Sequence, residues 1–212
     1  MKKSAKREAS LRLLQHDRNF LTQGFQSLAG VDEAGRGPLA GPVVASAVIV
    51  RDFSFSCRVD DSKKMSATAR EAAFEEILGK CFVGIGVVES EVIDKINIYQ
   101  ASLRAMEEAV MKLKRAPDCI LIDGPKTPKL PFKQFPIVDG DALSFSIACA
   151  SVAAKVIRDR MMNYYDVLYP EYGFKKHKGY GTADHLEALR KNGPCKIHRR
   201  SFGPVRKLWK PF

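Results

Sequence analysis

Three acidic residues in this sequence stand at the ends of apolar runs, where their side chains can do chemistry. Asp32 and Glu33 end a run typical of a buried strand, and Asp123 ends a second such run. Carboxylates there lose hydration unless a partner compensates, and a hard divalent cation commonly does because it binds carboxylate oxygens. Ligands of α/β sheets also gather at the carboxyl ends of strands. Asp32 and Glu33 therefore indicate a metal site, and Asp123 is a candidate functional acid.

A glycine-rich turn follows Glu33 and offers a second kind of contact. Arg36 stands between Gly35 and Gly37, and the segment DEAGRGPLAGP places three glycines and two prolines around this one cation. Glycines lack Cβ atoms, so backbone N–H groups can approach a ligand closely. DEAG alone is typical of an ordinary turn, since Asp favours turns. The whole segment instead favours a site that binds a phosphate or a sugar beside the metal.

A geometric condition applies to Asp32 and Glu33. Neighbouring residues of a regular strand point to opposite faces of the sheet. Both side chains can therefore face one metal centre only if the strand ends or twists at Glu33. Gly35, two residues later, is compatible with such an irregular strand end.

Asp141 and two lysines have roles that the residues alone leave open. Asp141 precedes a long predicted helix, where Asp is a strong N-cap, so its position favours a cap over a metal ligand. Lys63 and Lys64 lie in a polar turn, where they either bind phosphates or face solvent. We include both lysines as candidates for substrate binding.

Tyr180 lies between two glycines in a basic loop, a position that would expose its ring and hydroxyl. An exposed tyrosine can stack on a nucleotide and hydrogen-bond a ribose 2′-hydroxyl, the group that distinguishes RNA from DNA. A loop tyrosine can equally anchor its loop on the core, so the pattern alone does not choose between these roles. His177 and His198 have no metal-ligand spacing, and we assign neither to a metal.

The order of the predicted elements indicates an α/β domain with a mixed sheet. The predicted strands cover residues 29–33, 43–50, 81–88, 118–123 and 134–138. The predicted helices begin near Thr68, where Thr68 and Glu71 have the spacing of a capping box, near Asn97, after Asp141 and at Thr182. The third of these helices is long and ends at Pro170.

Length and charge narrow the class of protein. The 212 residues suffice for one domain with a real core, and no run approaches the length of a membrane helix. No apolar segment of a secretory signal follows the basic N-terminus, and five cysteines without CxxC spacing indicate a reducing, cytoplasmic compartment. Of the net charge of +11, residues 1–20 carry +4, residues 175–212 carry +9 and residues 21–174 carry −2. This distribution favours a metal site beside a basic surface for a polyanion.

Six ordered stretches resemble type 2 ribonucleases H, and specifically bacterial ribonuclease HII. They are DEAGRGPLAGPVVA at 32–45, DSKKMS at 61–66, LIDGP at 121–125, GDALSFSIACASVAAKVIRDR at 140–160, HKGYGT at 177–182 and HRRSFGPVR at 198–206. The related ribonuclease HIII pattern has DESG in place of DEAGRG and an added N-terminal domain. The resemblance covers about residues 26–206, nearly the whole chain.

The resemblance implies an α/β ribonuclease H-like fold with a mixed central sheet flanked by helices. It implies a catalytic domain over 26–212, whose part from about 170 is helical, after an N-terminal extension over 1–25. It also assigns Asp141 to the metal site, so that one or two Mg²⁺ or Mn²⁺ ions are bound by Asp32, Glu33, Asp123 and Asp141.

The activity implied by the resemblance is metal-assisted hydrolysis of RNA in RNA/DNA hybrids. It includes cleavage 5′ of ribonucleotides embedded in duplex DNA, which leaves 5′-phosphate and 3′-hydroxyl ends and serves ribonucleotide excision. The expected readers of the 2′-hydroxyl are Gly35, Arg36, Gly37 and Tyr180, in a protein that acts as a monomer away from membranes. Two alternatives are a nuclease or strand-transfer enzyme of the same fold that acts on DNA, and a non-catalytic nucleic-acid-binding module.

Overall fold

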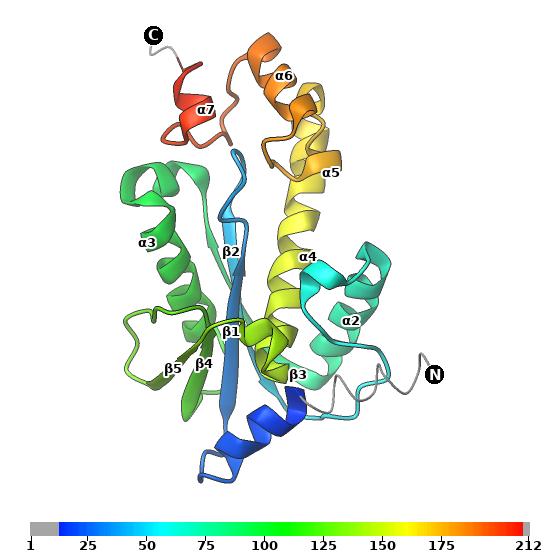
Figure 1. The fold of residues 1–212 in the computed structure, drawn as a ribbon, viewed down its shortest axis with the longest axis vertical. Coiled ribbons are helices and arrows are strands. Elements are labelled where there is room, and N and C mark those ends of the chain that lie inside the picture. The colour runs from blue at the N-terminus through cyan, green and yellow to red at the C-terminus, as the bar shows by residue number, and fades with distance from the viewer. Residues whose placement is uncertain (1–12, 210–212) are drawn as a thin grey trace.

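The computed structural model describes residues 13–209 and is built around a five-stranded sheet (Figure 1). Its strands are β1 (Leu28–Ala34), β2 (Val43–Val50), β3 (Cys81–Val88), β4 (Cys119–Asp123) and β5 (Lys133–Ile137). Their spatial order is β3-β2-β1-β4-β5. β1 pairs antiparallel with β2 and parallel with β4, while β2–β3 is antiparallel and β4–β5 parallel. The predicted mixed sheet is confirmed.

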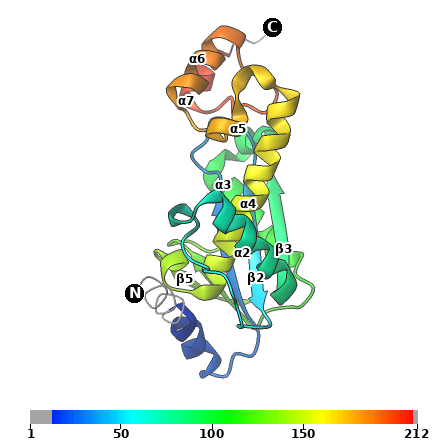
Figure 2. The same cartoon turned by 90° about the vertical axis from the view of Figure 1, so that its right-hand side faces the viewer.

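Helices cover both faces of this sheet. The main ones are α2 (Ala67–Lys80), α3 (Ser90–Met111) and α4 (Phe145–Leu168). α3 lies on one face, whereas α4 lies on the other with α2 packed beside it (Figures 1 and 2). Residues 13–21 form a further helix at the end of the sheet, where Asp17 accepts hydrogen bonds from the backbone and hydroxyl of Ser146. Residues 1–12 of the predicted N-terminal extension lie outside the described part of the chain.

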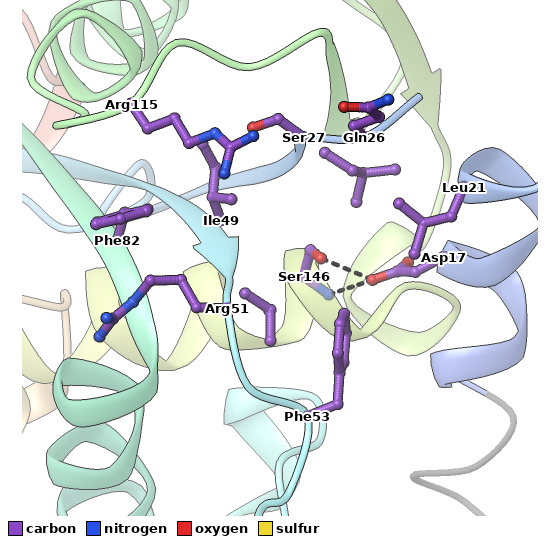
Figure 3. A pocket seen from close by; sticks show the side chains of 12 residues that line it. Asp17, Leu21, Gln26, Ser27, Ile49, Arg51, Phe53, Phe82, Arg115 and Ser146 are labelled. Atoms are coloured by element: carbon purple, nitrogen blue, oxygen red, sulfur yellow. Dashed lines mark hydrogen bonds between the residues drawn. The ribbon is translucent and has the colours of Figure 1, made fainter. Parts of the chain in front are cut away.

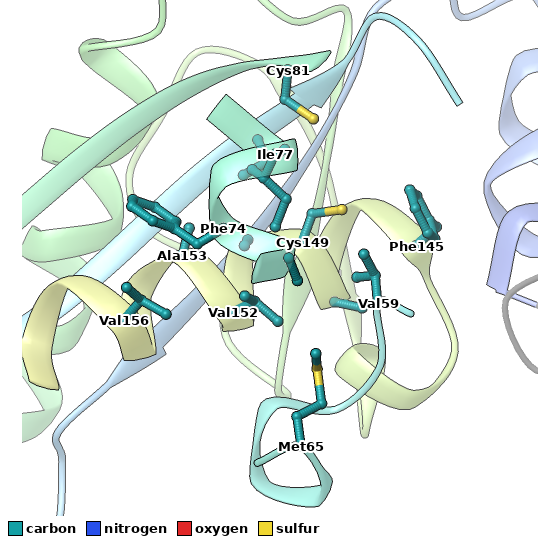
Figure 4. Close-up of a cluster of buried hydrophobic side chains, with 14 of the residues drawn as sticks. Val59, Met65, Phe74, Ile77, Cys81, Phe145, Cys149, Val152, Ala153 and Val156 are labelled. Carbon is teal, nitrogen blue, oxygen red and sulfur yellow. The ribbon is translucent and has the colours of Figure 1, made fainter. Parts of the chain in front are cut away.

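The core on the α4 side forms between α2 and α4. Phe74 and Ile77 of α2 belong to one buried cluster with Cys149, Val152 and Val156 of α4 (Figure 4). Burying a large apolar side chain contributes about 1.5–3 kcal/mol to stability. This packing holds α4 along the sheet and thereby positions the residues that α4 presents to the strand ends.

α4 approaches β1 closely because Gly30 carries no side chain. A Cβ on Gly30 would stand 2.1 Å from the carbonyl carbon of Ser146 in the first turn of α4. Alternate residues of a strand share a face, so Asp32, two residues after Gly30, also lies on the α4 face of β1. The glycine therefore sets the depth at which this carboxylate sits beneath the helix.

The two helix starts that were predicted from polar residues differ in detail. Ser66 caps α2, because its side chain accepts from the backbone N–H of Ala69, so the expected Thr68–Glu71 capping box is wrong. α3 begins at Ser90, earlier than predicted, and its backbone breaks at Asn97, where φ is +64°. The Asn97 side chain accepts from two later N–H groups and so caps the second part of this helix.

The C-terminal part is helical, as predicted, and packs on the far end of α4 (Figure 1). Its helices are α5 (Phe174–His177), α6 (Ala183–Asn192) and α7 (Gly203–Arg206). Apolar side chains from this part and from the end of α4, among them Met162, Phe174 and Leu189, form a separate buried cluster. Over residues 13–209, no helix is long and apolar enough to cross a membrane.

Candidate active site

The sheet register places two of the predicted acids side by side. Val31 of β1 pairs with Ile122 of the parallel neighbour β4, so the next residues, Asp32 and Asp123, stand at the same carboxyl edge of the sheet. Asp32 is only 5% exposed. A sheet edge that ends two adjacent strands in acids is the usual place for a ligand in α/β proteins.

At Glu33, β1 has no irregular end that would turn this side chain to the face of Asp32. β1 continues through Ala34 in regular pairing with β2, so Glu33 lies on the face opposite Asp32. The Glu33 backbone N–H donates to Oδ1 of Asp32 at 2.6 Å, and the Glu33 carboxylate pairs with Arg36 at 3.3 Å. The strand thus ends one residue later than predicted, at Ala34. The two carboxylates approach the end of β4 from its two faces.

Asp141 reaches the same edge through a short turn between β5 and α4. It lies in a single 3-10 turn, Gly140–Ala142, and is 6% exposed. The helix cap is instead Ser144, whose side chain accepts from the backbone N–H of Ile147, so the N-cap interpretation of Asp141 is wrong. The Gly140 N–H donates to Oδ1 of Asp123 at 2.7 Å, which fastens the turn of Asp141 to the end of β4.

The loop of Lys63 closes the α4 side of this site. The hydroxyl of Ser62 lies 2.9 Å from that of Ser151 on α4. Lys63, with a side chain 79% exposed, places Nζ 3.4 Å from Oδ2 of Asp141. Lys64 pairs instead with Asp61 at 3.4 Å. Lys63 therefore belongs to the acidic site, whereas Lys64 points to its own turn.

Three of the acids have raised pKa values, which indicates that a nearby positive charge would stabilise their ionised forms. Burial raises the pKa of Asp32 well above its ordinary value, and repulsion from Glu33 and Asp123 adds to the rise. Burial also raises the pKa of Glu33, against the opposing charge of Arg36. The pKa of Asp141 rises for the same reason, against the opposing charge of Lys63. A cation among these groups would offset both the cost of burying their charges and the repulsion between them.

The acids fit a hard divalent cation by chemistry but do not already surround one. Within residues 13–209, no three acidic, histidine or cysteine side chains are arranged so that they could hold an ion. Glu33 and Asp141 are instead engaged by Arg36 and Lys63. Carboxylate oxygens are the ligands that Mg²⁺ and Mn²⁺ prefer. Binding of an ion therefore requires these side chains to turn from their cationic partners toward the strand ends.

The glycine-rich turn and Tyr180 lie next to each other. A Cβ on Gly37 would stand 3.6 Å from Cε1 of Tyr180, an ordinary contact distance. Tyr180 is 45% exposed, as expected, and both Arg36 and Gly37 are exposed. His185 holds the Tyr180 loop from below, because its Nδ1–H donates to the Tyr180 carbonyl at 2.9 Å. The structure therefore brings the sequence-predicted turn and tyrosine into one exposed patch.

Two buried arginines support this patch, and sequence analysis assigned no role to them. Arg158 of α4 and Arg199 donate only to backbone carbonyls among the described residues, including those of Gly35 and Arg36. Each is at most 1% exposed. Arg158 lies within the motif at 140–160 and Arg199 within the motif at 198–206. Their partners are backbone carbonyls, which every residue has, so the residue types do not reveal these contacts.

The surface has one hollow beside the acids and another at the opposite end of the sheet. A small hollow of about 80 Å³ borders Glu33, Arg36 and Asp123. A larger cavity of about 460 Å³ lies near Leu28 and Val50, at the far ends of β1 and β2, and holds no acidic cluster (Figure 3). The hollow at the acids is smaller than the roughly 300–1,000 Å³ of typical small-molecule pockets, so the site suits a polymer that lies across the sheet edge better than a small enclosed molecule.

Comparison with known proteins agrees with the fold. A family model described as "Ribonuclease HII" matches residues 29–205. The "Ribonuclease HII" of Syntrophobacter fumaroxidans is 55% identical over 92% of this chain and 84% of its own length. The "Ribonuclease HII" of Geobacter metallireducens is 56% identical over 86% of each chain. The crystal structure of ribonuclease H2 from Pyrococcus horikoshii OT3 is similar with a TM-score of 0.74, at 24% identity over 86% of this chain and 97% of that one.

The sheet topology and the structural match give this chain the ribonuclease H-like fold, and the family match makes it a metal-dependent nuclease of that fold. Such nucleases depend on divalent metal ions for hydrolysis. Within this class the chain belongs to the ribonuclease HII family, which cleaves RNA in RNA/DNA hybrids endonucleolytically. The family resemblance of the sequence is thus confirmed.

Proposed function

We propose that Asp32, Glu33, Asp123 and Asp141 bind one or two ions of Mg²⁺ or Mn²⁺ and that the protein hydrolyses phosphodiesters on the 5′ side of ribonucleotides. The observation that carries this proposal is the meeting of acids from β1, β4 and the 3-10 turn at one sheet edge, three of them with raised pKa values. A bound divalent ion supplies an activated water and neutralises charge on the phosphate.

The cationic partners of the acids are also candidates for binding the substrate. Arg36 and Lys63 neutralise Glu33 and Asp141 in the metal-free structure. When an ion takes over the carboxylates, the two cations are released at the open edge. Both side chains are more than half exposed, so they can reach a substrate phosphate from there. Lys63 would thus pair with Asp141 in the metal-free protein and bind a phosphate in the substrate complex.

Selectivity for ribose resides away from the acids, because carboxylates and metal ions do not contact a 2′-hydroxyl selectively. The turn at 35–37 offers exposed backbone, and the Tyr180 phenol beside it can donate or accept a hydrogen bond. A site built to pair a hydroxyl rejects substrates that lack it, because its polar groups are then left unpaired. We assign recognition of the ribose to this patch.

The exposed basic surface of the C-terminal part extends the binding site. Lys175 and Lys176 are exposed on α5, close in sequence to Tyr180. Such lysines bind phosphates without regard to sequence. We propose that the protein acts as a cytoplasmic monomer on RNA/DNA hybrids and ribonucleotide-containing duplexes. In this assignment residues 26–212 are the catalytic domain and residues 1–25 an extension to it.

A metal-dependence assay tests the proposed function. An RNA/DNA hybrid and a DNA duplex with one ribonucleotide are incubated with the full chain in EDTA, Mg²⁺ or Mn²⁺. Both substrates should remain intact in EDTA and be cleaved when either ion is added, while an all-DNA duplex should stay intact. Cleavage of the hybrid in EDTA, or equal cleavage of the all-DNA duplex, would contradict the proposal.

A further inference from the structure

Arg199 is a fully buried cation whose hydrogen bonds all go to the backbone around the glycine-rich turn. Its Nη2 donates to the Gly35 carbonyl at 2.6 Å, its Nη1 to the Arg36 carbonyl at 2.9 Å and its Nε to the Gly41 carbonyl at 3.0 Å. Burial lowers the pKa of Arg199 to about 9, so the group stays charged at neutral pH. A charge buried without a carboxylate partner is costly, which indicates that this arrangement serves a purpose other than stability.

Arg158 performs the same task for the neighbouring segments. It donates to Pro42 at 3.0 Å, to Ala40 at 3.1 Å and, from its Nη1, to the Lys178 carbonyl at 3.0 Å. One guanidinium thereby joins the segment between the turn and β2 to the loop that carries Tyr180. A Cβ on Gly35 would stand 2.0 Å from Arg158 Nε, so this arginine fills the space beneath the turn.

The arginines fix the direction of the N–H groups in the turn. A trans peptide points its C=O and N–H in opposite directions, and the described chain contains no cis peptide. Because the carbonyls of Gly35 and Arg36 point inward to Arg199, the N–H groups of Arg36 and Gly37 point away from it. Neither N–H donates to another described residue, and both residues are exposed.

The charge of Arg199 also strengthens these donors. A hydrogen bond to a peptide carbonyl polarises the peptide, so the N–H at its other end becomes a better donor. Two such donors stand beside the Tyr180 ring, which lies against Gly37. This combination suits an oxygen with two lone pairs, such as that of a ribose hydroxyl, which can accept from two donors at once.

We propose that Arg199, with Arg158 beneath it, is the positioning residue for ribose selectivity, because it holds the Arg36 and Gly37 N–H groups toward the 2′-hydroxyl. The inference rests on the proposed function and extends it from the exposed patch to its buried support. Arg199 does not touch the substrate. It acts through the backbone of the turn.

The variant Arg199→Lys tests this role, with Arg190→Lys as the matched control. Lysine keeps the charge but cannot span two carbonyls with a planar fork. Arg190 is exposed on α6 and donates to Leu186 within its own helix. The single-turnover rate on a duplex with one ribonucleotide should fall roughly 10- to 100-fold in Arg199→Lys, less than the roughly 100- to 1,000-fold loss when a preorganised donor is removed, because the variant misorients the donors without removing them. Affinity for the duplex in EDTA should change by less than about threefold, since phosphate contacts supply most of it.

Amide NMR supplies a readout that does not depend on activity. The amide ¹⁵N shifts of Arg36 and Gly37 should move in Arg199→Lys, because each reports the hydrogen bond at the carbonyl of its own peptide. The control should leave both signals in place. If the lysine variant does not fold, the wild-type protein decides through couplings across the hydrogen bonds from the Arg199 guanidinium to the Gly35 and Arg36 carbonyl carbons. Absence of these couplings would overturn the inference.

The outcomes separate this inference from the function on which it rests. A wild-type protein that cuts all-DNA and ribonucleotide-containing duplexes equally would refute the proposed function. If the wild type prefers ribose and a folded Arg199→Lys retains the full rate and preference, only the role of Arg199 is refuted. A loss of rate with unmoved Arg36 and Gly37 amides would also overturn it, because the loss would then not act through the turn.

Discussion

The backbone N–H of Gly140 donates to Oδ1 of Asp123 at 2.7 Å, and this hydrogen bond joins the end of β4 to the turn that carries Asp141. One carboxylate oxygen of Asp123 is thus used by the fold, which leaves the other for a metal ion. The same contact explains why two acids that are far apart in the sequence meet at one edge.

Asp123→Asn should abolish turnover and keep the fold. The amide oxygen can still accept from Gly140, so the turn stays in place, but the ligand charge is lost. We expect the cleavage rate at saturating Mg²⁺ to fall at least about 100-fold, the scale of losing a charge-stabilising group. Asp139→Asn is the matched control, since Asp139 is exposed and its left-handed backbone suits Asn. A near-normal rate in Asp123→Asn would remove Asp123 from the site.

The repulsion among the acids should appear as a metal-dependent stability. A carboxyl whose pKa is raised by folding stabilises the folded state below its unfolded pKa, and this stability is lost as the pH rises through the raised pKa. Asp32, Glu33 and Asp141 all shift in this direction. The metal-free protein should therefore be less stable at pH 8 than in mild acid on account of these groups.

Calorimetry with and without Mg²⁺ measures this effect. At pH 8, Mg²⁺ at about 100 times its dissociation constant should add about 2.7 kcal/mol to the free energy of unfolding. Asp32→Asn should raise the Tm in EDTA and reduce the gain from Mg²⁺. A lower Tm for Asp32→Asn in EDTA would show that repulsion at Asp32 does not destabilise the protein.

The histidines of the C-terminal part should make stability depend on pH in the opposite sense. His198 accepts at Nδ1 from the backbone N–H of Cys195 at 3.0 Å, and its Nε2 lies 3.1 Å from Nε2 of His185. Burial, together with the nearby His185, lowers the pKa of His198 to about 3. Its contribution to stability is therefore present above about pH 6.5, the usual histidine pKa, and lost as the pH falls toward 3.

His198→Asn isolates this contribution. The Asn side chain can replace Nδ1 as the acceptor for Cys195 but cannot reach His185, so stability at pH 7 should drop by about 1–3 kcal/mol. Between pH 6.5 and 4, urea unfolding should then show a shallower loss of stability than in the wild type. An unchanged slope would assign acid sensitivity to other groups.

Sequence patterns revealed the acids and the exposed patch because these residues follow simple local rules. Asp32 and Asp123 end apolar runs, and Tyr180 lies between glycines in a polar loop. The register of β1 and β4 then brings the first two together, which a strand pattern alone does not specify.

Other features could not be predicted from the sequence because they depend on contacts between segments that are distant along the chain. Arg158 donates to the carbonyl of Pro42, 116 positions away, and Arg199 donates to that of Gly35, 164 positions away. Any residue type can supply a carbonyl, so the sequence does not indicate these partners. Helical spacing alone would place Leu78 on the apolar face of α2, yet it is 48% exposed, and the buried residues of this helix are Ala73, Phe74 and Ile77. Ser144 caps α4 because Asp141 lies in a separate 3-10 turn, Gly140–Ala142, which ends before the helix begins.

Tyr180→Phe tests whether the phenol reads the ribose. Phenylalanine keeps the ring against Gly37 and removes only the hydroxyl. Cleavage at a single embedded ribonucleotide should fall about tenfold or more, because a site that pairs a hydroxyl discriminates strongly. Hybrid affinity should fall much less, and Tyr180→Ala should cleave more slowly than Tyr180→Phe because stacking is lost as well. Wild-type rates in both variants would make Tyr180 a loop anchor.

The most direct test of the central claim is a map of the product ends from a duplex that carries one labelled ribonucleotide. The proposed site activates a water at the phosphate on the 5′ side of the ribose, so we predict a single cut there. The products should carry a 5′-phosphate and a 3′-hydroxyl, and they should form only when Mg²⁺ or Mn²⁺ is present. A cut on the 3′ side with a 2′,3′-cyclic phosphate would contradict the account, because the 2′-hydroxyl itself would then be the nucleophile.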